Sequence, residues 1–184
     1  MDESPAANGA ASTKFAKGWY LVSWSTDLEP GGVKPLRYFG KNYVLFRGED
    51  GKATLLDAHC PHLGAHLGYG GRVEGNDIIC PFHAWRFGPS GRCTEVPYAS
   101  RIPPRAAVRA YRVQEHSGMI VAYFGPEGSE PDYEVPAIAE MDDPAWTPLQ
   151  QAHIEIATHP REVIENIADL AHFMSGSSLG GGIA

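Results

Sequence analysis

Cysteine is scarce in this chain of 184 residues, which contains only Cys60, Cys80 and Cys93. An odd and sparse set of thiols does not supply the disulfide framework of a small secreted scaffold. It is typical of a reducing cytoplasm, where thiolates bind metal ions instead of pairing with one another. We therefore expect a cytoplasmic protein whose cysteines serve as ligands or as buried side chains.

Long hydrophobic runs are missing as well. No stretch of about 18 apolar residues occurs, so the sequence predicts no membrane span. The first residues, MDESPAANGAASTK, lack the apolar core of a secretory signal. We expect residues 1–14 to form a disordered leader.

A basic stripe is also absent, and the net charge of the chain is -7. This balance excludes a nucleic-acid partner. It is compatible with a basic redox partner and equally with an ordinary solvated surface. The hydrophobic content of 43% and the charged content of 20% are those of a globular protein that can bury a core.

Short β-type runs, broken by turn residues, fill the chain from Gly18 to about Phe124. The runs include WYLVSW, NYVLFRG and GMIVAYFG, and the turns include GEDGK, GPSGR and EHSG. Glycine, aspartate and serine at such points favour hairpins. Many short strands without helical periodicity predict a mainly β fold, an antiparallel sandwich or small barrel.

The remainder of the chain has a different composition. Residues 131–149 are rich in proline and acidic residues and predict a linker. Residues 150–174 then predict a strand, from Gln150 to Ile156, and a helix with Pro160 at its first position. The helix is expected to bury the apolar face Val163, Ile167, Leu170 and Met174, and residues 175–184 have the composition of a Gly/Ser-rich tail.

Two cysteines and two histidines lie in two short segments, CPHLGAH (residues 60–66) and CPFHAWRF (residues 80–87). Soft thiolates together with imidazoles suit zinc or an iron–sulfur cluster. Zinc knuckles usually pair two cysteines in one loop, whereas each loop here supplies one cysteine and one histidine. That division suits a two-iron cluster in which one iron takes both cysteines and the other takes both histidines. A zinc site and a chance grouping are the alternatives at this point.

These segments and their flanking strands, from about residue 18 to residue 131, resemble the Rieske [2Fe-2S] proteins. The resemblance implies a Rieske-type antiparallel β-sandwich or barrel over residues 15–130, with hairpin loops that bind the cluster. It also implies four ligands for a [2Fe-2S] cluster, namely Cys60, His62, Cys80 and His83.

The loops indicate a subclass within that resemblance. Rieske proteins of respiratory and photosynthetic chains carry an extra cysteine in each loop, and here the matching positions are Ala65 and Phe82. Those proteins also donate hydroxyl hydrogen bonds to the cluster sulfurs, from positions that match Trp85 and Phe87. Fewer donors stabilise the reduced cluster less, so we expect a low-potential electron carrier.

The other histidines, the third cysteine and the loop glycines are expected to have structural roles and not to bind metal. His59 and His66 flank the first loop as surface or supporting residues, and His116 and His153 are expected to be structural. Cys93 is expected to be a small buried hydrophobic residue. Glycines around the loops are expected to permit tight turns, at positions 64, 68, 70, 71 and 75.

A second motif lies in the predicted helix, where ENIADLAHFM places Asn166, Asp169 and His172 on one side. Alone, three polar residues at this spacing usually form a solvated face. The segment resembles the Asn-x2-Asp-x2-His-x4-His motif of Rieske non-haem iron oxygenases. The resemblance implies that Asp169 is an electron-transfer bridge between subunits and that His172 is the first ligand of a mononuclear Fe(II).

The sequence departs from that motif at Ser177, where the second histidine ligand is expected, and a later carboxylate is missing. It therefore predicts a chain truncated just inside an α+β catalytic domain, with an incomplete mononuclear iron site. We do not expect this chain alone to activate oxygen.

Two functions follow from the resemblance. The first is an oxygenase component that accepts electrons from an NAD(P)H-dependent reductase or a ferredoxin and hydroxylates or desaturates a hydrophobic, steroid-like substrate. Phrases such as GWYLVSWSTDL and VPYA resemble the branch of 3-ketosteroid 9α-hydroxylases and cholesterol 7-desaturases. The second is a stand-alone Rieske-type ferredoxin. Intact oxygenases of this kind form homotrimers, whereas a chain without most of the catalytic domain is expected to be monomeric.

Overall fold

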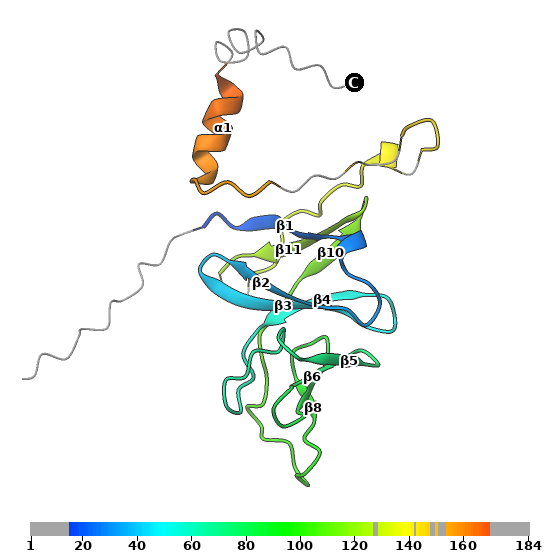
Figure 1. The fold of residues 1–184 in the computed structure, drawn as a ribbon, viewed down its shortest axis with the longest axis vertical. Helices are drawn as coiled ribbons and strands as arrows, with labels where there is room; N and C mark the ends of the chain where they lie inside the picture. Colours follow the sequence, from blue (N-terminus) through cyan, green and yellow to red (C-terminus); the bar gives the residue numbers. More distant parts are fainter. Residues whose placement is uncertain (1–14, 127–128, 142, 148–149, 151–153, 170–184) are drawn as a thin grey trace, which may run out of the picture. The chain divides into compact units, whose positions relative to one another are not determined.

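The computed structural model describes residues 15–126, 129–141, 143–147, 150 and 154–169. They fall into two compact units, Met1–Trp146 and Thr147–Ala184. The first unit contains three antiparallel sheets, and the expected mainly β fold is confirmed (Figure 1).

Two of the three sheets pack against each other in the first unit. One has the order β1-β11-β10, and the other has the order β2-β3-β4-β9. The strands of the first sheet are β1 (Gly18–Trp24), β10 (Val113–His116) and β11 (Met119–Phe124). Those of the second are β2 (Val33–Tyr38), β3 (Lys41–Arg47), β4 (Ala53–Asp57) and β9 (Ala110–Tyr111). The short 3-10 helices η1 (Ser25–Asp27) and η2 (Ala139–Met141) lie in connections.

Strand β3 is buried on both faces, because its sheet is a middle layer. Side chains alternate along a strand, so Tyr43 and Leu45 pack in the core shared with the β1-β11-β10 sheet. Val44 and Phe46 face the other way, into the core beneath the metal-binding loops. All four are at most 2% exposed. The two cores are therefore separated by a single layer of backbone.

The third sheet is small and lies beside these loops, in the order β5-β6-β7-β8. Its strands are β5 (Arg72–Glu74), β6 (Asp77–Ile79), β7 (Arg86–Phe87) and β8 (Cys93–Glu95). Ile78 and Phe87 are completely buried and anchor the sheet on the core that contains Phe46.

The three expected hairpin turns are confirmed between β3 and β4, between β7 and β8, and between β10 and β11. The turn between β10 and β11 shows most clearly why these residues form a hairpin. Ser117 and Gly118 both have positive φ, at 52° and 71°, as a two-residue turn requires to match the strand twist.

The first part of the predicted linker packs on the β1-β11-β10 sheet. The indole N–H of Trp19 donates to the Tyr133 carbonyl at 2.8 Å, and the backbone N–H of Val135 donates to the Gln114 side chain at 3.1 Å. Lys17 and Asp132 form an exposed ion pair at 2.6 Å. The chain divides between Trp146 and Thr147, inside the predicted linker of residues 131–149.

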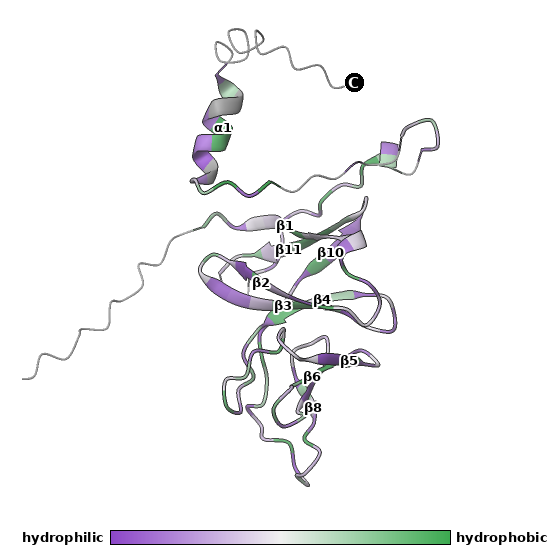
Figure 2. Cartoon of the chain, viewed as in Figure 1, coloured by the Kyte–Doolittle hydropathy of each residue, from purple (hydrophilic) through white to green (hydrophobic). Residues whose placement is uncertain are grey.

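The second unit contains one helix among its described residues, α1 (Pro160–Ala168), which begins at the expected proline. The helix carries both hydrophilic and hydrophobic residues (Figure 2). Its expected buried face is not observed at Val163, which is 39% exposed, because no second regular element of the described part of this unit covers it. Leu170 and Met174 lie outside the described residues.

The expected strand before the helix is also not observed at Gln150 or at residues 154–156, and residues 151–153 lie outside the described part. Within the residues that the structure describes, no helix is long and apolar enough to cross a bilayer.

Candidate metal centre

The first loop, residues 60–65, follows strand β4 and is closed by two backbone hydrogen bonds. The N–H of Cys60 donates to the Ala65 carbonyl at 2.9 Å, and the N–H of Gly64 donates to the Cys60 carbonyl at 2.9 Å. Gly64 has φ of 75°, a left-handed conformation that glycine adopts without a Cβ penalty. The loop therefore folds back on its own cysteine.

The second loop, residues 80–85, follows strand β6 and repeats this hydrogen-bond pattern. The N–H of Cys80 donates to the Trp85 carbonyl at 2.8 Å, and the N–H of Ala84 donates to the Cys80 carbonyl at 3.1 Å. Ala84 takes the place of Gly64 and also has positive φ, at 57°. Two separate hairpins thus present their cysteines in the same local backbone geometry.

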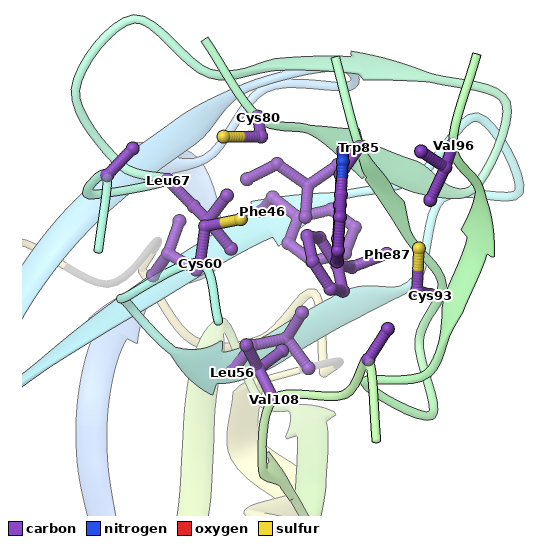
Figure 3. Close-up of a cluster of buried hydrophobic side chains, with 14 residues drawn as sticks. Phe46, Leu56, Cys60, Leu67, Cys80, Trp85, Phe87, Cys93, Val96 and Val108 are labelled. Carbon is purple, nitrogen blue, oxygen red and sulfur yellow. The ribbon is translucent and has the colours of Figure 1, made fainter. Parts of the chain in front are cut away.

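Both cysteines lie inside the protein, each 2% exposed. Figure 3 shows them within the core that contains Phe46, Leu56 and Leu67. Burial raises the pKa of the Cys60 thiol to about 11, assisted by the adjacent Cys80 thiol, while the backbone N–H of His62 opposes the shift. Metal binding must displace this proton, because the thiolate is the ligand form.

The two histidines lie at the outer side of the loops. His62 is half-buried and His83 is exposed. Their ring centroids are 4.7 Å apart and the planes cross at 72°. His62 and His83, which the sequence predicts as ligands of the same iron, are thus neighbours in space, although 20 residues separate them in the chain.

The donor set fits a [2Fe-2S] group held by Cys60, Cys80, His62 and His83. In the described part of the chain, no three Cys, His, Asp or Glu side chains gather as a site for one ion, whereas a tetrahedral zinc site needs four donors around one point. Two ligands on each of two irons need no such convergence. The buried Cys60 and Cys80 thiols and the outer His62 and His83 rings are the groups that would hold the cluster.

His59 and His66 support the first loop. The Asn42 amide lies 3.3 Å from Nε2 of His59, and the Gly64 carbonyl lies 3.1 Å from its Nδ1. The tautomer with its proton on Nδ1 satisfies both contacts, because the amide nitrogen only donates and the carbonyl only accepts. His66 accepts the backbone N–H of Gly68 at 3.0 Å, and burial lowers its pKa.

Trp85 and Tyr98 complete the surroundings of the histidines, a role that the sequence does not predict for either residue. The Trp85 indole lies parallel to the His62 ring, with centroids 4.8 Å apart and 5° between planes. Its N–H donates to the Tyr98 hydroxyl at 2.6 Å. The only signal in the sequence is the position of Trp85 two residues after His83; the contact with Tyr98 depends on the fold of a separate loop.

The other candidates have structural environments. Cys93 is 8% exposed and its thiol donates to the Glu95 carbonyl at 3.3 Å. Figure 3 shows it away from Cys60 and Cys80, beyond Phe87. His116 ends β10, and both of its ring nitrogens are buried without a hydrogen-bond partner among the described residues.

Comparison with known families decides the identity of this centre. The family model described as "Rieske [2Fe-2S] domain" matches residues 18–112, which include both loops. The chain belongs to the Rieske [2Fe-2S] family. A second family model, described as "3-Ketosteroid 9alpha-hydroxylase C-terminal domain", matches residues 122–176.

Relatives of the Rieske chain carry the names of steroid-transforming enzymes. A probable 3-ketosteroid-9-alpha-monooxygenase oxygenase component of Rhodococcus rhodochrous is 41% identical over 90% of this chain and 42% of its own length. Cholesterol 7-desaturase nvd 1 of Ciona intestinalis is 38% identical over 90% of this chain and 37% of its own length. The chain thus spans about two fifths of the curated relatives it matches.

Solved structures share the fold. Dicamba monooxygenase bound to dicamba superposes with a TM-score of 0.75 at 24% identity, over 84% of this chain and 46% of that one. A Pseudomonas putida CBB5 NdmA QL mutant with theobromine gives a TM-score of 0.72 at 26% identity, over 85% of this chain and 48% of its own.

The second motif is only partly described. Asp169 follows α1, and its backbone N–H donates to the Glu165 carbonyl at 3.1 Å. His153, His172 and Ser177 lie outside the described residues, and so does the Asn166 side chain. A mononuclear iron site therefore has no pair of ligands among the described residues.

Proposed function

We propose that this chain is the electron-accepting part of a Rieske oxygenase component, and that its own chemistry is one-electron transfer. The observation that supports this most is the pair of equivalent loops, which bury both thiols and place the His62 and His83 rings 4.7 Å apart at the outer side. When bound there, a [2Fe-2S] cluster accepts and releases single electrons.

The residues of the chain have separable tasks in this proposal. Cys60 and Cys80 would hold one iron through their thiolates, and His62 and His83 would hold the other through ring nitrogens. His59 fixes the first loop through the Gly64 carbonyl. The hydrophobic Trp85 and Phe87 stand where hydroxyl donors raise the potential of other Rieske centres, so a low potential is proposed.

The activity of the whole oxygenase is proposed from the relatives. We propose O2-dependent hydroxylation or desaturation of a steroid-like or other hydrophobic substrate, with electrons from an NAD(P)H-dependent reductase or a ferredoxin. Asp169 is proposed as the bridge to a mononuclear iron, and His172 as a ligand of that iron. A homotrimer is proposed for the intact oxygenase, and a cytoplasmic location for the protein.

The alternative of a stand-alone Rieske-type ferredoxin is less well supported. It assigns no role to residues 122–176, which match the catalytic-domain family model. The contacts of Tyr133 and Val135 with the β1-β11-β10 sheet are equally unexplained by it.

The test is the iron and acid-labile sulfide content of anaerobically purified protein, with an EPR spectrum after dithionite reduction. Two irons and two sulfides per chain with a Rieske-type signal are expected. One zinc ion and a silent spectrum would refute the proposal. An additional high-spin ferrous ion would extend it, because the mononuclear site would then be complete in this protein.

The control for this test is His116→Ala, which alters a half-buried histidine on β10 outside both loops. It should retain iron and sulfide, whereas His62→Ala and Cys80→Ala should lose them.

A further inference from the structure

The loop between β8 and β9 is positively charged, although the chain as a whole has a net charge of -7. From residue 86 to residue 112 the sequence contains six arginines and one glutamate, and no lysine or aspartate. They are Arg86, Arg92, Arg101, Arg105, Arg109, Arg112 and Glu95. A local reversal of charge of this kind can guide an oppositely charged partner to one face.

Only Arg86 and Arg112 of these six arginines pair with carboxylates within the described part of the chain. Arg86 pairs with Glu74 and Glu95 at 2.8 and 3.0 Å, and Arg112 pairs with Glu130 at 2.7 Å. Arg101 and Arg105 are exposed and form no such pair with a described residue. Their charge is therefore available to a partner.

The loop that carries them is anchored at both ends. Val96 is 5% exposed at its start and Ala106 is 8% exposed at its end. The N–H of Cys93 donates to the Ala106 carbonyl at 2.9 Å, and the N–H of Ala106 donates to the Pro103 carbonyl at 2.9 Å. Between these anchors the green loop projects beyond β8 in Figure 1. Arg101 and Arg105 are thus presented on a fixed projection.

The same loop reaches the metal centre through aromatic side chains. Tyr98 is 62% exposed, and its hydroxyl accepts the Trp85 N–H at 2.6 Å. Trp85 is 7% exposed and lies flat against His62, with centroids 4.8 Å apart. A surface residue is thereby joined to an iron ligand by one hydrogen bond and one ring stack. His83, in contrast, is itself exposed, so the two histidines face different surroundings.

We propose that the Tyr98 face, defined as Tyr98, Arg101, Ile102 and Arg105, is the docking surface for an acidic electron-donor protein, and that Trp85 and His62 conduct the electron inward. The proposal rests on the proposed function, since it needs the [2Fe-2S] group. With a [2Fe-2S] cluster held by Cys60, His62, Cys80 and His83, one electron would leave the reduced iron–sulfur group of the donor, which is oxidised, and would reduce that cluster by one electron. No bond would be made or broken. This arrangement leaves the exposed His83 free for a different electron acceptor.

The experiment measures reduction of the cluster-loaded full chain by a reduced plant-type [2Fe-2S] ferredoxin, an acidic one-electron donor. Such ferredoxins have potentials near -400 mV, below the Rieske range of about -150 to +300 mV, so the transfer is downhill. The bleaching of the visible absorbance is followed anaerobically in a stopped-flow instrument at several ionic strengths. Reduced methyl viologen serves as a small donor that needs no docking surface.

Arg101→Glu and Arg105→Glu are compared with Lys52→Glu, which makes the same charge change on a residue 83% exposed in the β3–β4 turn. At low ionic strength, each arginine variant should lower the second-order rate constant with ferredoxin roughly tenfold or more, and salt should reduce the difference. The rate with methyl viologen should not fall. Arginine variants that react with ferredoxin as fast as Lys52→Glu would overturn the docking surface.

The aromatic route is tested by Tyr98→Leu and the conservative Tyr98→Phe, at saturating ferredoxin. Tyr98→Leu should slow the limiting first-order transfer several-fold at an unchanged reduction potential, and Tyr98→Phe should slow it as well, because it lacks the hydroxyl that accepts the Trp85 N–H. An unchanged limiting rate in Tyr98→Leu would overturn the route.

Failure of this proposal can be distinguished from failure of the proposed function. A chain without iron, sulfide and EPR signal would refute the function itself. A cluster that forms and accepts electrons from methyl viologen, but responds to ferredoxin equally in all variants, would refute only the docking surface. A change from oligomer to monomer in Arg101→Glu, measured by sedimentation, would assign the face to contacts between copies and overturn the proposal.

Discussion

Exchange of one histidine ligand for cysteine tests the proposed ligand set. His83→Cys replaces a neutral imidazole with a thiolate and so adds one negative charge to the bound cluster. Added negative charge favours the oxidised form, and the reduction potential therefore falls. His62→Cys adds the same charge at the other loop, so the two variants differ chiefly in their surroundings.

The expected magnitude follows from ligand type and burial. Plant-type clusters with four cysteines lie near -400 mV, and Rieske centres begin at about -150 mV, so two ligand exchanges account for about 250 mV and one for ~125 mV. His83 is exposed, and water screens the new charge there. His62 is half-buried and covered by Trp85, and charge interactions are stronger where the permittivity is lower. We therefore expect a larger fall in His62→Cys than in His83→Cys.

The assay is an EPR-monitored redox titration at pH 7, after iron and sulfide have been measured in each variant. His116→Cys is the control, since it introduces a cysteine on β10 and should leave the potential unchanged. A higher potential in either ligand variant would refute the ligand assignment. A larger fall in His83→Cys than in His62→Cys would refute the reasoning from burial.

Three further predictions concern the protein around the centre. Arg47, 8% exposed, donates to Glu115 at 2.6 and 2.8 Å and also to the Leu28 and Gly51 carbonyls, so Arg47→Leu should lower the free energy of unfolding by about 1–3 kcal/mol in urea denaturation. Arg47→Leu with Glu115→Leu should recover the part of this loss that comes from the unpaired carboxylate but not the part that comes from the carbonyls, and a double variant as unstable as the single one would contradict the explanation. Because Arg47 lowers the pKa of Glu115 from its ordinary 4.5, the pair stabilises the protein above that pH and is lost as pH falls through the lower, folded value. Acid titration of the double variant should accordingly show a weaker loss of stability. Ala84→Gly should stabilise the protein by about 1 kcal/mol and Gly64→Ala should destabilise it similarly, because only alanine is penalised at positive φ; calorimetric shifts of the same sign would count against this. Cys93→Ser should retain two irons and two sulfides, and loss of iron would show that Cys93 serves the centre.

Much of the first unit could be predicted from the sequence because its signals are local. The strands of five to seven residues carry apolar runs, and their turns carry Gly, Asp and Ser. Strands β5, β7 and β8 are only two or three residues long, too short for a period of two to be recognised. They form because the buried Ile78 and Phe87 fix them on the core.

The candidate site also has a part that local sequence predicts and a part that depends on the fold. The spacing of cysteine and histidine within each loop predicts the ligand pairs, since ligand geometry limits local spacing. The Trp85–Tyr98 hydrogen bond joins residues 13 apart, and nothing in their sequence neighbourhood specifies that contact. The predicted linker was assigned from proline and acidic composition, but Trp19 and Gln114 bind its backbone, and composition does not report such partners.

The burial of both faces of strand β3 affects how its register is specified during folding. A strand with one polar face is held in register because a shift by one residue would expose its apolar side chains. In β3 the shift would merely exchange one apolar pair, Tyr43 and Leu45, for another, Val44 and Phe46. Arg47 distinguishes the two alignments, because its guanidinium also donates to the carbonyls of Leu28 at 2.7 Å and Gly51 at 2.6 Å. A charged residue in the interior thus supplies the alignment information that the hydrophobic residues of this strand lack.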